Sequence, residues 1–289
     1  MKTNQKISIL LILITYFGLS AFENKKYRTT VINLKDAIKS KVIQVEFRST
    51  GNYQGASIVA KITNTRGKPI KLIIPAGSYF DAQTEKEQDL VLAKDVIVQL
   101  APKASSSKVL NGFCCKASNR CPIKGNNFRL SDKKLDKFDL LTTFLKGKKF
   151  AKNDLQDAVW CISDRRAISN VSGKNCKELR EKLASITGLK NDWYSSPQSR
   201  TVDRFGNINR ETVAIHGDVK FQCPANALVH QEIRDISGKV LVKGSSNTAL
   251  NKGTINYIFN VSVKGWKKGE YTVALVNRSQ VLVSSKFKV

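Results

Sequence analysis

Apolar and polar residues alternate along the last third of the chain. Apolar side chains occupy every second position from Ile255 to Val263, and the same spacing returns at residues 271–275 and 281–283. A period of two is typical of strands that bury one face. The turn-forming stretches Asp235–Gly238 and Lys267–Glu270 lie between apolar runs. The pattern predicts an Ig-like β-sandwich over residues 211–289.

A similar alternation marks the first half of the chain. Residues 41–49 and 55–64 alternate and are separated by Thr50–Tyr53, which favours a pair of antiparallel strands. Further short strands are predicted at residues 70–74, 88–93, 96–100 and 108–114. Short strands with turn residues between them predict a β-sandwich in the domain that spans residues 22–191.

The period changes to that of a helix beyond Cys121 and Pro122. Three apolar faces follow: Leu135, Phe138, Leu141 and Leu145; Leu155, Val159 and Ile162; and Leu179, Leu183 and Ile186. We therefore expect three helices within roughly residues 133–190. Asn153 or Asp154 is a candidate cap of the second helix, and Gly188 ends the third. Residues 192–210 read as a linker, so the predicted fold is mainly β with an α-helical appendage.

The first residues have the order of a secretory signal peptide. Lys2 and Lys6 precede the apolar run 7–14, which small residues at 18–21 follow. The run is shorter than the roughly 20 residues that a membrane-spanning helix needs. We expect a signal peptide over residues 1–21, secretion of the chain, and no transmembrane helix in the mature protein.

The C-terminal segment resembles a known export module. The sequences DISGKVL (235–241) and GEYTVALVNRSQVLVSSKFKV (269–289) are similar to the C-terminal sorting domain of cargo of the type IX secretion system in Bacteroidota. The resemblance implies a place on the outer-membrane surface or outside the cell. Implied partners are outer-membrane or secretion-system proteins.

Charge narrows the range of partners. The formal net charge is +26, and the basic residues are spread over the whole chain. A nucleic-acid module would concentrate them on one element and interleave aromatic residues, so no specific nucleic-acid partner is expected. A distributed positive field favours polyanions such as surface glycans or lipopolysaccharide, with affinity that falls as salt rises.

Six cysteines are expected to meet an oxidising compartment after export. The preferred disulfide joins Cys161 to Cys176, which bracket a polar loop. Cys115 and Cys121 are the other disulfide candidates.

Metal and enzyme chemistry find little support in the sequence. A zinc site would need a second pair of ligands beside Cys114, Cys115 and Cys121, and the sequence has none nearby. The only histidines, His216 and His230, lie far downstream. Nucleophilic-elbow and phosphate-loop motifs are missing. We expect no metal, no cofactor and no enzyme activity other than thioester self-chemistry.

Two short motifs resemble the paired motifs of thioester-containing adhesin domains on Gram-positive surfaces. They are the aromatic-cysteine strand Gly112–Cys115 and the helix start Leu155–Trp160. The resemblance implies that the thiol of Cys114 or Cys115 condenses with the side-chain amide of Gln156. The thioester would then acylate an amine on a target surface, and Trp160 would shield it.

A capping role for Gln156 is the alternative interpretation. If Asn153 caps the helix, Gln156 is its third residue and folds back onto the cap, while Trp160 is part of the core. The leading functional hypothesis is a noncatalytic binding or adhesion protein displayed on the cell surface. The alternatives are a structural accessory subunit of an outer-membrane, secretion or gliding complex, and a covalent adhesin.

Overall fold

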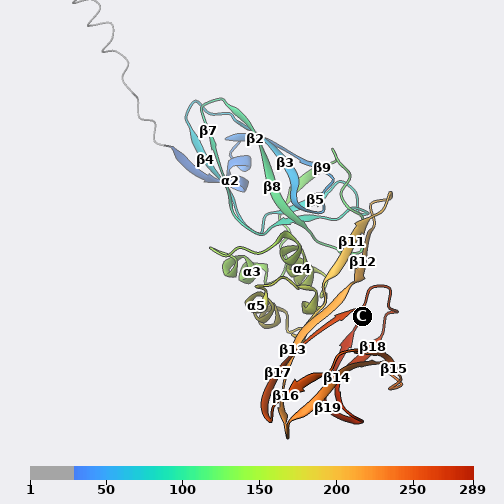
Figure 1. Cartoon of the computed structure of the whole chain (residues 1–289). Coiled ribbons are helices and arrows are strands. Elements are labelled where there is room, and N and C mark those ends of the chain that lie inside the picture. Colours follow the sequence, from blue (N-terminus) through green and yellow to red (C-terminus); the bar gives the residue numbers. More distant parts are fainter. Residues whose placement is uncertain (1–28) are drawn as a thin grey trace, which may run out of the picture.

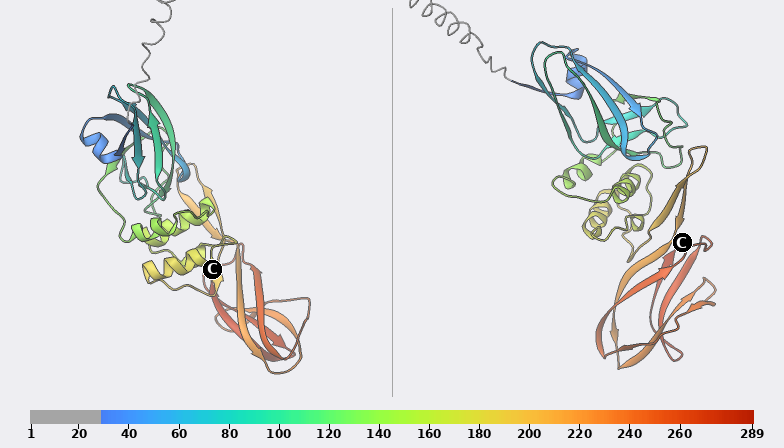
Figure 2. Two further views of the ribbon diagram at one scale, coloured as in Figure 1. Left: turned by 90° about the vertical axis from the view of Figure 1, so that its left-hand side faces the viewer. Right: turned by 45° about the horizontal axis from the view of Figure 1, so that its top comes forward.

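The computed structural model describes residues 29–289 and shows a mainly β protein. The predicted signal peptide, residues 1–21, lies outside this range. Figure 1 shows two β regions with a layer of helices between them, and both views of Figure 2 agree. No helix within residues 29–289 is long and apolar enough to cross a membrane.

Six strands of the N-terminal region form a closed barrel with the strand order β2-β3-β8-β6-β5-β9. Their bounds are β2 Ile43–Ser49, β3 Gln54–Asn64, β5 Tyr79–Ala82, β6 Leu90–Leu92, β8 Ser105–Cys114 and β9 Asn127–Ser131. A barrel replaces the predicted sandwich because β9 closes the sheet. Phe128 in β9 pairs with Phe47 of β2 on one side and with Ala82 of β5 on the other.

A three-stranded sheet packs against the barrel. It consists of β1 (Thr30–Asn33), β4 (Ile70–Ile74) and β7 (Val96–Leu100) in the order β1-β4-β7, with β1 parallel to β4. Buried residues of this sheet, such as Leu72, share one core with Phe80 and Leu110 of the barrel. The short helix α2 (Leu34–Lys39) adds Leu34 to the same core and has no counterpart in the sequence prediction.

The helical layer follows the barrel. It contains α3 (Phe138–Phe144), α4 (Lys152–Ser163) and α5 (Lys177–Thr187), with a 3-10 turn, η1 (Ile168–Asn170), before α5. The apolar faces recognised in the sequence are buried together in one core. Gly188 ends α5 with a left-handed backbone, φ 68°, as predicted.

The start of α4 differs from the sequence prediction. Ala151 is the N-cap and makes no side-chain capping bond, so Asn153 and Asp154 lie inside the helix. The side chains of Asn153 and Asp154 accept hydrogen bonds from other parts of the chain instead. Asn153 Oδ1 accepts a hydrogen bond from Gln54 at 2.7 Å, and Asp154 Oδ1 accepts one from the Gly173 amide at 2.9 Å.

The C-terminal region contains two sheets over one core. One has the order β10-β13-β17, and the other has the order β15-β14-β18-β19 with β16 paired to β14. The bounds are β10 Tyr194–Ser195, β13 Ala214–Cys223, β14 Ala227–Arg234, β15 Val240–Lys243, β16 Thr248–Leu250, β17 Gly253–Ser262, β18 Glu270–Asn277 and β19 Gln280–Lys288. Phe259 of the first sheet and Val273 and Phe287 of the second belong to the same core.

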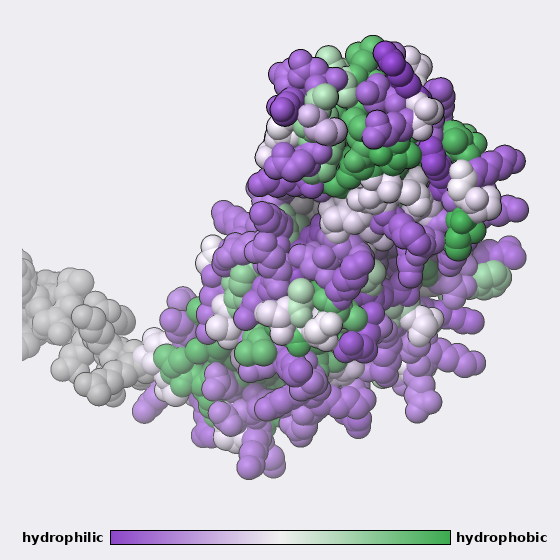
Figure 3. Space-filling model, turned by 90° about the horizontal axis from the view of Figure 1, so that it is seen from below, coloured by the Kyte–Doolittle hydropathy of each residue, from purple (hydrophilic) through white to green (hydrophobic). Residues whose placement is uncertain are grey.

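The segment predicted as a linker contains regular structure. Strands β11 (Gln198–Val202) and β12 (Ile208–Thr212) form an antiparallel hairpin, joined by an Asp203–Asn207 turn. In Figure 1 this hairpin runs beside α4, and the chain then enters the C-terminal sheets, whose last residue lies close to it. Figure 3 views the protein from below Figure 1, the end at which the C-terminal sheets lie, and shows a mostly hydrophilic surface with separate apolar patches.

Candidate functional site

Gln156 and Cys114, the residues of the two sequence motifs, meet in the structure. Gln156 Oε1 accepts a hydrogen bond from the Cys114 amide at 3.0 Å, and Gln156 Nε2 donates one to the Cys114 carbonyl oxygen at 2.8 Å. Both residues are 0% exposed. The capping interpretation of Gln156 is wrong, because the side chain points to the barrel strand β8 rather than to the start of its own helix.

The two neighbouring cysteines face different cores. Cys114 belongs to the barrel core, whereas Cys115 belongs to the core of the helical layer, as the alternation of a strand dictates. Only Cys114 is hydrogen-bonded to the Gln156 amide; the Cys115 amide donates to the Asp89 carbonyl instead. Burial raises the pKa of both thiols well above the ordinary cysteine value, so both are protonated at neutral pH.

Trp160 lies one helical turn after Gln156 and is 0% exposed. Its ring is parallel to that of Tyr53, with 6.2 Å between the ring centres. Three guanidinium groups surround the indole, at 4.3 Å from its centre for Arg210, 5.4 Å for Arg200 and 5.9 Å for Arg166. Trp160 is therefore part of a buried cation–π cluster as well as of the core.

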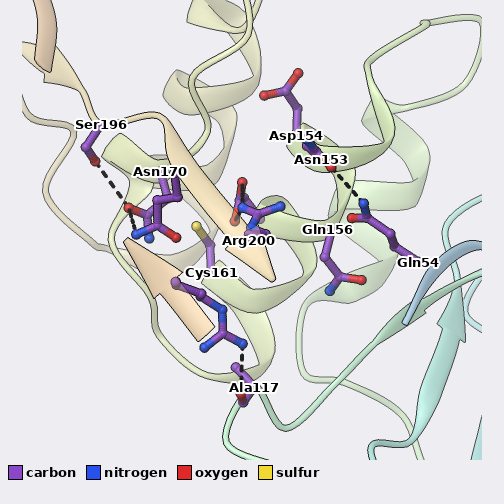
Figure 4. Close-up of polar contacts among 12 residues, drawn as sticks. Gln54, Ala117, Asn153, Asp154, Gln156, Cys161, Asn170, Ser196 and Arg200 are labelled. Carbon is purple, nitrogen blue, oxygen red and sulfur yellow. Dashed lines mark hydrogen bonds and ion pairs between the residues drawn. The ribbon is translucent and has the colours of Figure 1, made fainter. Parts of the chain in front are cut away.

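The β11–β12 hairpin supplies two of these arginines. Arg200 and Arg210 are directly opposite each other in the strand register. Arg200 binds both carboxylate oxygens of Asp157 on α4, and the two side chains are only 7% and 4% exposed. Arg210 donates to the Ala117 carbonyl oxygen at 2.8 Å, which Figure 4 draws as a dashed line. These contacts attach the hairpin to both the helical layer and the barrel.

Burial and like charge perturb the ionisable groups of this cluster. Burial raises the pKa of Asp157 to about 6, against the opposing effect of the Arg200 charge. Burial, together with the neighbouring charges of Arg166 and Arg200, lowers the pKa of Arg210 to about 10. Removal of the ions from water thus outweighs their attraction, as is common for buried ion pairs.

Several buried donors of the cluster have no hydrogen-bond partner among residues 29–289. They are Nε of Arg166, Nε of Arg210, Nε and Nη1 of Arg200, and Nε1 of Trp160. Buried polar groups are normally satisfied, so the concentration of unpartnered donors around Trp160 distinguishes this cluster from the rest of the described core.

A cleft of about 950 Å³ reaches this cluster from the surface. Arg166, Asn170 and Arg210 line it on the side of the helical layer and the hairpin, while Trp266 and Lys268 line it on the side of the C-terminal sheets. Its volume falls in the range of small-molecule sites. The cleft therefore lies where the helices, the hairpin and the C-terminal region meet.

The candidate disulfides are not formed in the structure. All six thiols are free and buried. Cys161 Sγ is 3.8 Å from the Ala167 carbonyl oxygen, whereas Cys176 is the N-cap of α5. Cys115 and Cys121 likewise form no bond.

Metal-ligating residues do not gather in the described part of the chain. Residues 29–289 hold no group of three or more histidine, cysteine, aspartate or glutamate side chains that could bind a metal. His230 Nε2 is 3.0 Å from Glu232 Oε1, and Glu232 in turn binds Arg234, so these three side chains form a row of polar contacts along one strand.

The sequence does not identify Arg200 and Arg210 as site residues. Pro197 and several serines make residues 192–210 look like a linker. The signal that marks them is the Asp203–Asn207 turn between two polar runs of equal length, which is typical of a hairpin. Which side chains such a hairpin buries depends on the surface that it covers.

Comparison with known proteins identifies no family. No family model matches the sequence, and no curated protein matches it. Among solved structures, DesR, a β-glucosidase from Streptomyces venezuelae in complex with D-glucose, aligns at 9% identity with a TM-score of 0.17. The alignment covers 85% of this chain and 47% of that chain, and its low TM-score supports no argument about fold or activity.

Proposed function

We propose that this chain is a noncatalytic binding or adhesion protein, exported through the type IX secretion system and displayed on the outer-membrane surface. In this proposal the C-terminal region is an Ig-like sandwich that serves as the sorting and docking module. The observation that carries the binding role is the cleft between the hairpin and the C-terminal sheets. It combines charged, hydroxyl, amide and aromatic side chains in one concave surface, as ligand sites do.

The arrangement also favours retention of the C-terminal module. Trp266, Lys268 and Lys286 form part of the wall of the cleft. The Trp193 indole donates to the Lys286 carbonyl oxygen at 2.7 Å, and Tyr194 accepts from the Lys288 amide at 3.1 Å. Removal of the module would open the cleft and expose both aromatic residues. We therefore infer that the displayed protein keeps it.

Deletion of residues 213–289 tests the sorting role. The truncated chain should remain in the periplasm, whereas the full chain should be accessible to protease on intact cells. Normal surface delivery of the truncated chain would contradict the proposal. Co-purification of the full chain with an outer-membrane complex, without binding to external surfaces, would favour the accessory-subunit alternative.

A covalent adhesin is a second candidate, favoured by the contact between the Gln156 amide and Cys114. In that chemistry the Cys114 sulfur attacks the Gln156 amide carbon, a C–S bond forms, and the amide nitrogen leaves as ammonia. A target amine then attacks the same carbon, forms an amide bond and releases the thiol. Complete burial of both residues would protect the thioester from water.

Intact-mass spectrometry of the nonreduced chain tests this candidate. Loss of ammonia lowers the mass by about 17 Da, and methylamine should add to the chain and release one thiol. The Cys114→Ala variant should have its full calculated mass, whereas Cys115→Ala, the matched control, should still lose ammonia. An unmodified mass of the wild-type chain would exclude the thioester.

A further inference from the structure

We propose that the part of the cleft lined by Arg166 and Arg210 binds the carboxylate of an acidic saccharide such as a uronate. The inference rests on the proposed binding function and names the class of ligand. Both arginines line the cleft, and both belong to the cluster around the buried Trp160.

Two arginines without a carboxylate partner line the cleft. Arg166 and Arg210 are both in its wall, and neither forms an ion pair within 4.0 Å among residues 29–289. Arg200 does not line the cleft, and its Nη2 atom binds both carboxylate oxygens of Asp157. A carboxylate accepts several N–H donors at once and matches the planar edge of a guanidinium group.

Charge is the second observation. The wall of the cleft carries six basic side chains: Arg166, Lys190, Arg210, Lys268, Lys286 and Lys288. Lys190 is paired with Asp192 at 2.9 Å, and Lys286 is paired with Glu270 at 2.7 Å. The other four have no carboxylate within 4.0 Å in the described part of the chain. Asp192, Glu211 and Glu270 also line the cleft, so its wall carries three more basic than acidic side chains, and an anionic ligand would meet a net positive charge.

The rest of the cleft fits the hydroxyl groups of a sugar better than an isolated ion. Ser196 and Gln198 both donate to Asn170 Oδ1, at 3.2 and 3.3 Å, and these three residues line the cleft as a polar row; Figure 4 draws the contact of Ser196 with Asn170. Across the cleft the half-buried Trp266 offers an apolar face. The whole surface is larger than one carboxylate requires.

Calorimetry with the purified full-length chain tests the proposal. Trigalacturonate should bind with measurable heat, and the neutral analogue galactotriose, which lacks all three carboxylates, should bind at least tenfold more weakly because even one charged hydrogen-bonding contact accounts for that factor. Raising the salt concentration should weaken the binding of trigalacturonate. Inorganic phosphate serves as the third ligand and should compete only weakly because it makes no contact along the polar row.

Charge-matched variants distinguish binding in the cleft from nonspecific attraction of the ligand by the basic surface. Arg166→Gln with Arg210→Gln should weaken trigalacturonate binding at least tenfold. Lys61→Gln with Lys108→Gln removes the same charge from exposed positions of the barrel and should leave the affinity unchanged. Because Arg210 packs on Trp160, its variant is checked by thermal unfolding. Lys268→Gln with Lys288→Gln changes only exposed lysines of the cleft and should weaken binding by a smaller factor.

Three results would overturn the inference: equal binding of the neutral and acidic trisaccharides, equal loss of affinity in the Arg166/Arg210 and Lys61/Lys108 double variants, or tighter binding of phosphate than of trigalacturonate. Adhesion of the chain to cell surfaces is measured separately. If the chain adheres but binds no uronate, the ligand class is wrong and the binding function stands. If it binds uronate but is never displayed, the proposed location is wrong instead.

Discussion

The side-chain amide of Gln156 on α4 forms hydrogen bonds with both the amide and the carbonyl oxygen of Cys114 at the end of β8. The two residues are 42 positions apart, and each is fully buried. A glutamine that satisfies both polar groups of one strand residue acts like an additional strand partner. This contact fixes the helical layer against the barrel, whether or not the amide ever reacts.

Replacement of Gln156 by alanine should lower the free energy of unfolding by about 1–3 kcal/mol. The Cys114 carbonyl would lose its donor inside a water-free region, which costs the desolvation of that group. Denaturant titration followed by circular dichroism measures the effect. Gln99→Ala, on an exposed position of β7, is the control and should change stability by less than about 0.5 kcal/mol. Equal effects of the two substitutions would contradict the buried contact.

Asp157 should make stability depend on pH between about pH 4 and 6. Its folded pKa is raised to about 6 from 3.8, chiefly by burial. In this interval the unfolded chain releases the proton while the folded protein keeps it, so stability falls as pH rises. Wild type should lose about 2–3 kcal/mol relative to Asp157→Asn over this range, measured by urea unfolding. Parallel pH profiles for the two proteins would refute the shifted pKa.

Gly217 is the position on β13 that permits close approach of Trp193. A Cβ atom at residue 217 would lie 2.7 Å from both the Trp193 carbonyl oxygen and its ring. Gly217→Ala should therefore cost about 1–3 kcal/mol, because backbone and ring would have to move apart. Gly67→Ala has open space around it and is the matched control. Thermal unfolding distinguishes them, and an unchanged midpoint for Gly217→Ala would disprove the contact.

The cysteines should be unreactive in the folded protein and countable after denaturation. All six are buried, and burial raises the pKa of Cys161 and Cys176 to about 12 and that of Cys121 to about 11. Ellman's reagent should therefore react slowly with the native chain at pH 8. Denatured, nonreduced chain should yield six thiols. Each disulfide would remove two thiols from this count, so a value of four would show one disulfide, and peptide mapping would then test whether it joins Cys161 to Cys176.

A thioester alters the thiol count in a recognisable way. It would remove one thiol, and hydroxylamine, which cleaves thioesters, would restore it. The thiol count and the intact mass thus report on the same bond independently. Agreement between them is required before Cys114 is assigned a chemical role.

The sequence by itself determined the local structure over much of the described chain. The period of two between Ile255 and Val263 and the apolar spacing of Leu179, Leu183 and Ile186 indicated a strand and a helix that the structure contains. These patterns can be recognised in the sequence because one side of each element faces a core and is therefore apolar. Gly188 was predictable for a similar reason, since a left-handed backbone favours glycine.

Only the tertiary structure decided how the elements close and which polar side chains are buried. The barrel depends on β9, a short strand whose pairing with both β2 and β5 has no local signal. Arg200 and Arg210 lie in the predicted linker, and because the hairpin lies on α4 the Arg200 side chain is buried and Arg210 is half-buried against Trp160. The sequence motifs contain Cys114 and Gln156, but the contact between these residues depends on where α4 packs against the barrel. Such contacts depend on residues far apart in the chain, and local periodicity carries no information about them.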